Sequence, residues 1–312
     1  AEIFSGVILG IKFNLQMVLF LNFLFTTEKP NNINTLLGIL FVFYLRSLMY
    51  FKFMKNKKFN FSIFIIATIF VSSLLIGCGE HGDETYIVAT DATLAPMSFM
   101  SVGNDMIGFE PDLIRAIADK ARINISLVNV EWAGLFGGLI TKKFDMIISS
   151  VTVLEERKQR MGFSIPYLKS GLTLVVRKDE KNIASFEDTK NNNVLVGAQV
   201  GTTAYYFLEK ESSIKTKGYQ MYGHAISDLI NGKVDAVLGE SSGTLFLKNR
   251  PLFQEIKIVG EILSNEFYAV VLRKDENQLM AQINSAIKKL IADGTIAQLH
   301  KKWDLGQAAQ VP

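Results

Sequence analysis

The chain after residue 85 alternates short apolar runs with longer runs whose apolar positions repeat every three or four residues. Residues 86–90 are short and β-branched, which predicts a strand, and residues 109–121 have the periodicity of an amphipathic helix. The apolar positions on one face of this helix are Leu113, Ile114, Ile117, Ala118 and Ala121. Similar runs follow at 124–130, 135–140, 145–149, 155–160, 171–177, 193–197, 203–211, 224–231, 235–239, 267–273 and 278–293. This alternation predicts an α/β fold with parallel sheets and right-handed crossovers.

The first 53 residues have a different pattern. Residues 3–25 and 36–53 are apolar enough for either to cross a bilayer. We expect residues 1–53 to be a wrongly assigned start or a fragment of an upstream segment, because residue 1 is Ala and Met54 opens a complete export signal. The alternative interpretation is a membrane hairpin ahead of a third apolar segment.

Residues 54–77 have the parts of an export signal: a basic start, an apolar stretch at 61–76, and a small residue, Gly77, before the cleavage point. The sequence Leu-Ile-Gly-Cys at its end resembles a bacterial lipoprotein signal, although Ile76 stands where Ala or Ser is usual. The resemblance implies that Cys78 receives a lipid and becomes the new N-terminus. The alternative is a buried cysteine at the end of an uncleaved helix.

The charge of the chain supports this division. Residues 1–77 contain seven Lys or Arg and two Glu, whereas the rest of the chain contains 26 basic and 28 acidic residues. The exported part therefore has no basic surplus, which argues against a nucleic-acid partner. Its length suits one large domain or two lobes. Cys78 is the only cysteine, so the exported part contains no disulfide and depends on its core for stability.

A series of short motifs in the exported part resembles the extracellular solute-binding proteins of family 3, which bind polar amino acids. The motifs lie, in the order of that family, at 89–96, 108–113, 132–135, 144–150, 156–158, 163–167, 200–203, 232–237 and 292–295, followed by Lys302-Trp303. Each is weak alone, but together they cover residues 86–305 and follow a lipoprotein signal.

This resemblance implies the two-lobe periplasmic-binding-protein-like fold of type II, with the ligand in the cleft and two crossing hinge strands. We place lobe one at 86–170 plus 268–306 and lobe two at 171–267, with crossings at 171–175 and 267–271. The remaining segments are 54–77, the signal peptide; 78–85, the lipidated cysteine and linker; and 307–312, a tail. Such hinges close around the ligand, so that affinity and closure are linked.

The resemblance also implies an amino-acid site. Arg157, with the backbone N–H groups of Thr152 and Thr203, would bind the α-carboxylate, which needs a bidentate cation and oriented donors. Glu240, the Thr152 hydroxyl and the Ser150 carbonyl would bind the α-ammonium. The family usually has Asp where Glu240 stands. Without the resemblance, Arg157 is a solvated helix arginine and Glu240 an exposed strand-end carboxylate.

The rest of the expected pocket concerns the ligand's side chain. Trp132 would lie over its aliphatic or cationic part, and Asp91 would meet a distal positive or amide group. Leu94 stands where the family often has an aromatic residue, which favours aliphatic stems. Ser149 and Gln199 complete the expected ligand-binding set. The alternatives are core packing for Trp132 and a strand-end carboxylate, satisfied by nearby N–H groups, for Asp91.

Another departure concerns the start of the helix that contains Arg157. Leu154 stands where the family prefers Thr as an N-cap, and a leucine side chain cannot cap a helix. We therefore expect this helix to begin less firmly.

No catalytic or metal-binding set is visible in the sequence. His81, His224 and His300 lack ligand spacing, Ser149 and Ser150 lack a nucleophile elbow, and no glycine-rich phosphate loop follows a strand. We therefore expect no enzyme activity, no cofactor and no metal.

The sequence thus predicts a monomeric, lipid-anchored protein in the cell envelope that captures an amino acid, basic or polar, and delivers it to the permease of an ABC importer. Two alternatives stay open. One is a periplasmic dehydratase of the cyclohexadienyl type on the same fold, with Glu240 as general acid. The other is an amino-acid sensor module, for which residues 1–53 would be a membrane hairpin.

Overall fold

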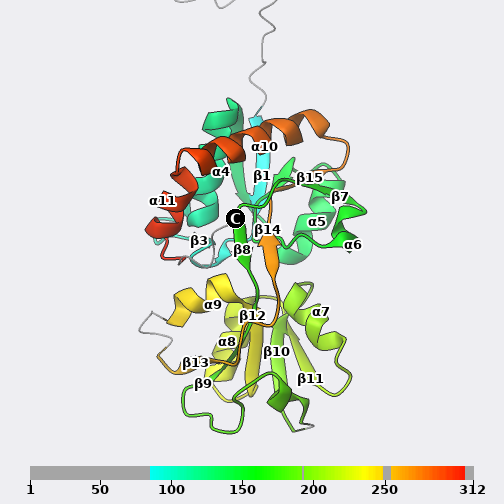
Figure 1. Ribbon diagram of the computed structural model, residues 1–312. Coiled ribbons are helices and arrows are strands. Elements are labelled where there is room, and N and C mark those ends of the chain that lie inside the picture. The colour runs from blue at the N-terminus through cyan, green and yellow to red at the C-terminus, as the bar shows by residue number, and fades with distance from the viewer. Residues whose placement is uncertain (1–84, 192, 249–253, 306–312) are drawn as a thin grey trace, which may run out of the picture. The chain divides into compact units, whose positions relative to one another are not determined.

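The computed structural model describes residues 85–191, 193–248 and 254–305 (Figure 1). These residues belong to one compact unit, His81–Pro312. The segment 1–53, the predicted signal peptide at 54–77, Cys78 and the tail at 307–312 lie outside the described residues.

The first lobe is built on a mixed five-stranded sheet in the order β5-β1-β6-β15-β7. Its strands are β1 (Thr85–Thr90), β5 (Asn124–Asn129), β6 (Met146–Ile147), β7 (Met161–Phe163) and β15 (Val271–Arg273). β1 pairs in parallel with β5 and β6, whereas β15 is antiparallel to β6 and β7.

Helices cover both faces of this sheet because neighbouring strand residues point to opposite sides. Val88 packs with α4 (Phe109–Ala121), α10 (Asn277–Ala292) and α11 (Thr295–Lys302), whereas Ala89 packs with α5 (Trp132–Ile140). The single-turn helix α6 (Glu155–Lys158) lies beside β7. Its N-cap residue, Leu154, makes no side-chain cap, as its apolar side chain predicts.

The second lobe repeats this arrangement with the strand order β11-β10-β12-β9-β13. Its elements are β9 (Leu172–Arg177), β10 (Leu195–Gln199), β11 (Lys215–Tyr219), β12 (Ala236–Glu240), β13 (Ile256–Val259), α7 (Thr203–Glu209), α8 (Tyr222–Ile230), α9 (Ser241–Lys248) and the short 3-10 helix η1 (Glu187–Lys190). Leu174 packs on the side of α7, and its neighbour Val175 packs on the side of α8. Each lobe therefore has two cores, one on either face of its sheet.

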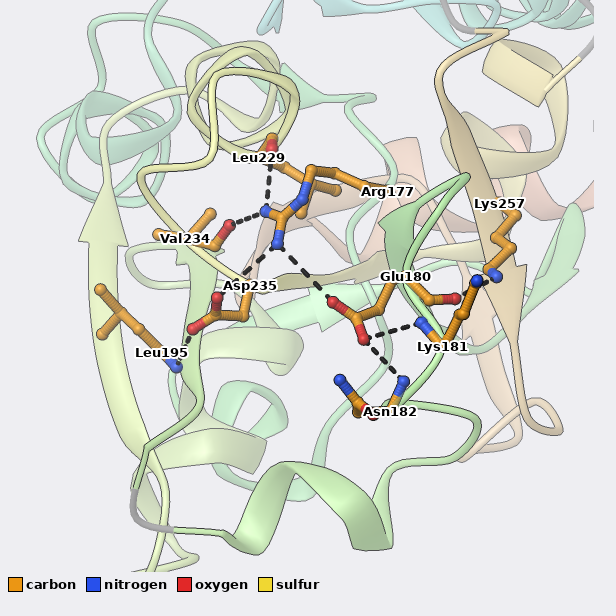
Figure 2. Close-up of polar contacts among 9 residues, drawn as sticks. All are labelled: Arg177, Glu180, Lys181, Asn182, Leu195, Leu229, Val234, Asp235 and Lys257. Carbon is orange, nitrogen blue, oxygen red and sulfur yellow. Dashed lines mark hydrogen bonds and ion pairs between the residues drawn. The ribbon is translucent and has the colours of Figure 1, made fainter.

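Arg177 holds the end of the second sheet together, as Figure 2 shows. Its Nη1 donates to the carbonyl oxygens of Leu229 and Val234, and its Nη2 pairs with Glu180 and Asp235. Asp235 in turn accepts a hydrogen bond from the backbone N–H of Leu195.

The first lobe contains the same device. Arg273 pairs with Asp145 and donates to the Phe144 carbonyl, while Asp145 accepts from the Ile87 N–H. Asp145 and Asp235, each placed directly before its strand, therefore tie equivalent strands of the two lobes.

Two short strands, β8 (Leu168–Ser170) and β14 (Glu266–Tyr268), pair antiparallel where the chain passes between the lobes (Figure 1). A small sheet of β2 (Thr93–Leu94), β3 (Ser98–Met100) and β4 (Met106–Ile107) completes the described fold. None of the described helices is long and apolar enough to cross a membrane.

The structure confirms the two-lobe α/β fold but corrects the expectation of parallel sheets. In each sheet four strands run in the same direction and one opposes them, because the strands that follow the crossings, β9 and β15, enter antiparallel to both of their neighbours. The run at 267–273 is accordingly two strands, β14 and β15, with residues 269–270 between them.

Candidate functional site

A cavity lies between the lobes, at the ends of the parallel strands. It holds about 370 Å³ of empty space, part of it open to solvent. Such edges of α/β sheets collect ligand-binding loops, because strand ends and helix starts meet there. The residues that line it are Asp91, Thr93, Leu94, Glu110, Trp132, Ser149, Ser150, Gln199, Thr202 and Glu240.

The structure brings together seven of the residues that the sequence singled out. Asp91 follows β1, Ser149 and Ser150 follow β6, Trp132 opens α5, Gln199 and Glu240 end β10 and β12, and Leu94 ends β2. Thr152, Arg157 and Thr203 do not line the cavity. Thr152 and Thr203 share a hydrogen-bond partner, Glu266, and Arg157 donates to the Thr152 carbonyl. Thr93, Glu110 and Thr202 line the cavity without having been predicted.

Arg157 contacts both lobes. Its Nη1 donates to the carbonyl oxygen of Thr152 at 3.1 Å, and its Nη2 donates to that of Gly201 at 3.2 Å. The guanidinium lies 5.7 Å from the ring centre of Trp132 and 5.0 Å from that of Phe136. Burial lowers the pKa of Arg157, and the negative charge of Glu240 opposes this shift. The expectation of a purely solvated helix arginine does not fit these contacts.

The hydroxyl groups of Thr152 and Thr203 meet at a carboxylate that the sequence did not reveal. Thr152 Oγ1 and Thr203 Oγ1 donate to Glu266 Oε2, at 2.8 and 2.9 Å. Glu266 is 7% exposed and also accepts from Ser264 Oγ at its other oxygen. Glu266 directly precedes the apolar run at 267–273, so the sequence alone indicates only an exposed acid at the start of a strand.

Asp91 is largely satisfied by neighbouring groups. Its carboxylate accepts from Thr93 Oγ1 at 2.8 Å and from the backbone N–H of Trp132 at 3.1 Å. Burial raises the pKa of Asp91, and these hydrogen bonds oppose the shift. The structure therefore combines both interpretations of this residue: it is tied locally, and it lines the cavity. Gln199 donates its side-chain N–H to the Gln220 carbonyl.

Glu110 lines the cavity and holds Ser150 in place. Its Oε1 accepts from the backbone N–H and the hydroxyl of Ser150, at 2.5 and 3.1 Å, and from the Tyr167 hydroxyl at 2.5 Å. Burial raises the pKa of Glu110 to about 7 against these hydrogen bonds. Ser150 has a positive φ of 50°, an uncommon conformation that such bonds can hold in place. The acid in the Gly-Phe-Glu motif was the available signal for this role.

Carboxyl groups are the only ionisable side chains among the residues that line the cavity. Burial, followed by repulsion from Glu266, raises the pKa of Glu240 to about 7, and Arg157 opposes the shift. Asp91, Glu110 and Glu240 line the cavity, while none of the ten lining residues is Lys or Arg. The lining therefore favours a ligand that brings positive charge.

Two glycines lie where the lobes come close. A Cβ on Gly201, whose φ is 79°, would lie 3.2 Å from Trp132 Nε1, and a Cβ on Gly243 would lie 2.6 Å from Leu94 Cδ1. These side chains thus contact lobe-two backbone across the cleft. No group of three or more His, Cys, Asp or Glu that could hold a metal ion occurs in the described part of the chain.

Comparisons with known proteins agree with this architecture. The chain is 30% identical over 221 residues to the L-cystine-binding protein TcyJ of Escherichia coli, an alignment that covers 70% of this chain and 82% of that protein. It resembles the solved structure of an ancestral arginine-binding protein bound to arginine, with a TM-score of 0.67, 33% identity, and coverage of 70% of this chain and 97% of that one.

A further solved structure is the ancestral amino acid-binding protein AncCDT-1, a precursor of cyclohexadienyl dehydratase. Its TM-score is 0.64 at 30% identity, with 70% of this chain and 94% of that one covered. The model of the bacterial extracellular solute-binding proteins, family 3, matches residues 86–307. The described fold, the interlobe cavity and this match lead to one conclusion: the chain belongs to family 3 of the bacterial extracellular solute-binding proteins.

Proposed function

We propose that this solute-binding protein captures a free amino acid in the cavity between its lobes and turns nothing over. The observation that supports this most is the position of Arg157, a half-buried cation whose two outer nitrogens donate to backbone carbonyls of different lobes. An α-carboxylate that exchanged for these carbonyls would gain a charged, bidentate partner.

The groups around Arg157 suit the remaining contacts of an amino acid's α-carboxylate and α-ammonium. The N–H groups of Thr152 and Thr203 complete the carboxylate site, while Glu240, the Thr152 hydroxyl and the Ser150 carbonyl receive the α-ammonium. Ser149 helps to hold Asp91 in position, because the Ser149 hydroxyl accepts a hydrogen bond from the backbone N–H of Asp91.

The ligand that fits best is a basic amino acid. Asp91 and Glu240 supply negative charge at separate points of the lining, and Trp132 supplies an aromatic face for a cation or its methylene stem. Leu94 gives an aliphatic wall. A second ligand carboxylate would find no Lys or Arg among the lining residues. The ancestral relative bound to arginine supports this assignment.

The same proposal includes anchoring and delivery. Lipid on Cys78 would hold the monomeric protein at the cell envelope, and the permease of an ABC importer would receive the amino acid. Support comes from the lipoprotein signal in the sequence and from the family, whose members are extracellular.

The direct test is calorimetric titration of the purified protein with arginine, lysine, ornithine, histidine, glutamine, glutamate and cystine, with prephenate and arogenate as the dehydratase control. We expect arginine, lysine, ornithine or histidine to bind ahead of glutamate, and no turnover of prephenate or arogenate. Tight binding of glutamate without arginine would overturn the ligand class, and conversion of prephenate or arogenate would overturn the binding-only function.

A further inference from the structure

Glu266 is a carboxylate at the crossing between the lobes. It begins β14, which pairs with β8. One of its oxygens, Oε2, accepts hydrogen bonds from both Thr152 and Thr203, while Oε1 accepts from Ser264. A single oxygen atom therefore joins two hydroxyl groups from separate parts of the chain.

These two hydroxyl groups belong to different lobes. Thr152 follows β6 of the first lobe and forms a β-bridge with Tyr268 of the crossing strand. Thr203 is the first residue of α7, whose core packs on the second sheet. A movement that carried Thr203 away from Thr152 would break at least one of the two bonds, because both end on the same oxygen atom. Ser264, in contrast, lies two residues from Glu266 on the same segment.

We infer that Glu266 is an interlobe clasp, a positioning residue that stabilises the observed arrangement of the two lobes by holding Thr152 and Thr203 on one carboxylate oxygen. The clasp is part of the protein itself and needs no ligand. The negative charge of Glu266 attracts the guanidinium of Arg157 and repels the carboxylate of Glu240.

The clasp also determines which further hydrogen bonds the hydroxyl groups of Thr152 and Thr203 can make. A threonine hydroxyl has one proton and two lone pairs. Since both protons go to Glu266, the oxygens of Thr152 and Thr203 can only accept further hydrogen bonds. Hydroxyls fixed in this way favour an ammonium group over a carboxylate, whose partners remain the backbone N–H groups and Arg157. This second step rests on the proposed function, whereas the clasp does not.

The experiment measures how far the two lobes are separated in the absence of ligand. Small-angle scattering of the purified protein gives the radius of gyration, which rises when the lobes separate. We expect Thr203→Val and Glu266→Ala to raise it, and the double variant to raise it no further. Glu266→Gln should restore the compact form relative to Glu266→Ala, because one amide oxygen can still accept both hydroxyls. Ser264→Ala, the matched control, should leave the radius unchanged.

The same variants separate the clasp from the proposed function. If arginine binds, its affinity should fall about tenfold with Thr203→Val in the parent protein, as for a hydrogen bond to a charged group, and should not change with Thr203→Val in the Glu266→Ala background. If no amino acid binds, the proposed function fails while the scattering result still decides the clasp. Equal radii for all variants, or independent effects of Thr203→Val and Glu266→Ala, would overturn it. Thr152→Val repeats the test should Glu266→Ala fail to fold.

Discussion

Arg157 donates a hydrogen bond from Nη2 to the carbonyl oxygen of Gly201, 44 positions later in the chain, at 3.2 Å. Arg157 lies on α6 of the first lobe, and Gly201 lies in the turn that leads from β10 to α7 of the second. This bond therefore crosses the cleft. It places the principal cation of the candidate site where the two lobes meet, so that a carboxylate bound to Arg157 also reaches the start of α7.

Replacing Arg157 with Ala should abolish most binding of an amino acid. Removal of one partner of a buried, hydrogen-bonded charge pair costs on the order of 2–5 kcal/mol, and calorimetry of the variant measures it. The ligand-free melting temperature should change little. Arg160→Ala, which removes an exposed arginine from the same segment, is the control and should bind normally. Unimpaired affinity of Arg157→Ala would place the carboxylate site elsewhere.

Gly201→Ala should weaken ligand binding more than Gly232→Ala. Both glycines have positive φ, 79° and 72°, so alanine brings a backbone cost of about 1–2 kcal/mol at either position. Only at Gly201 would the new Cβ also press on Trp132 across the cleft, since nothing lies within 4 Å at Gly232. Thermal denaturation should show a similar drop in melting temperature for both variants. Calorimetry should show a reduced affinity for the amino acid with Gly201→Ala alone. Equal affinities would mean that closure tolerates the extra methyl group.

The sequence predicted the elements whose apolar periodicity is strong. Residues 109–121 form α4 with the expected bounds, since its buried face repeats at helical spacing. The antiparallel entry of β9 and β15 could not be predicted, because strand direction depends on tertiary pairing rather than on local pattern. Weakly apolar elements such as β11, whose sequence is KTKGY, give little periodic signal and were missed.

The candidate site shows the same limit. Asp91 and Glu240 could be named from the resemblance, since each directly follows a predicted strand, at 86–90 and 235–239. Glu266 could not be identified from the sequence, because its partners Thr152 and Thr203 lie 114 and 63 positions away. A local sequence pattern does not predict hydrogen bonds between such distant residues. Glu110 was visible only as a motif residue, and its place beneath Ser150 depends on how α4 packs.

Asp91→Asn should lower affinity for a cationic amino acid more than for a neutral one. Asparagine keeps an oxygen that can accept from Thr93 or the Trp132 N–H, so the local structure should survive while the charge is lost. Calorimetry with arginine and glutamine measures the difference. Equal losses for the two ligands would mean that Asp91 only supports the start of α5, as the strand-end interpretation holds.

Cys78→Ala should either release soluble protein or leave an uncut precursor, because the predicted lipid attaches to the Cys78 thiol. Fractionation of cells that express the parent protein and the variant shows where each resides, and intact-mass analysis of the parent shows which residues it retains. The expected mass lacks residues 1–77 and includes a lipid. A mature protein that still contains residues 1–77 would contradict the signal-peptide prediction.

The pH dependence of binding should follow Glu240. Burial raises its pKa from the ordinary 4.5 to about 7, whereas an α-ammonium binds best to the ionised carboxylate. Affinity for arginine should therefore fall as the pH drops below about 7, approaching a tenfold loss per pH unit for one proton.

The same shift has the opposite sign for stability. The folded protein holds the Glu240 proton more tightly than the unfolded chain does, so the contribution of Glu240 to the free energy of unfolding decreases as the pH rises from about 4.5 to about 7. Glu240→Gln should remove this contribution, although Glu110, with a pKa also raised to about 7, will leave part of the slope. Calorimetric titrations at pH 5, 6 and 7, with denaturant unfolding at each pH, measure both effects. An affinity for arginine that stays constant from pH 5 to 7 would show that the ligand's ammonium group does not meet Glu240.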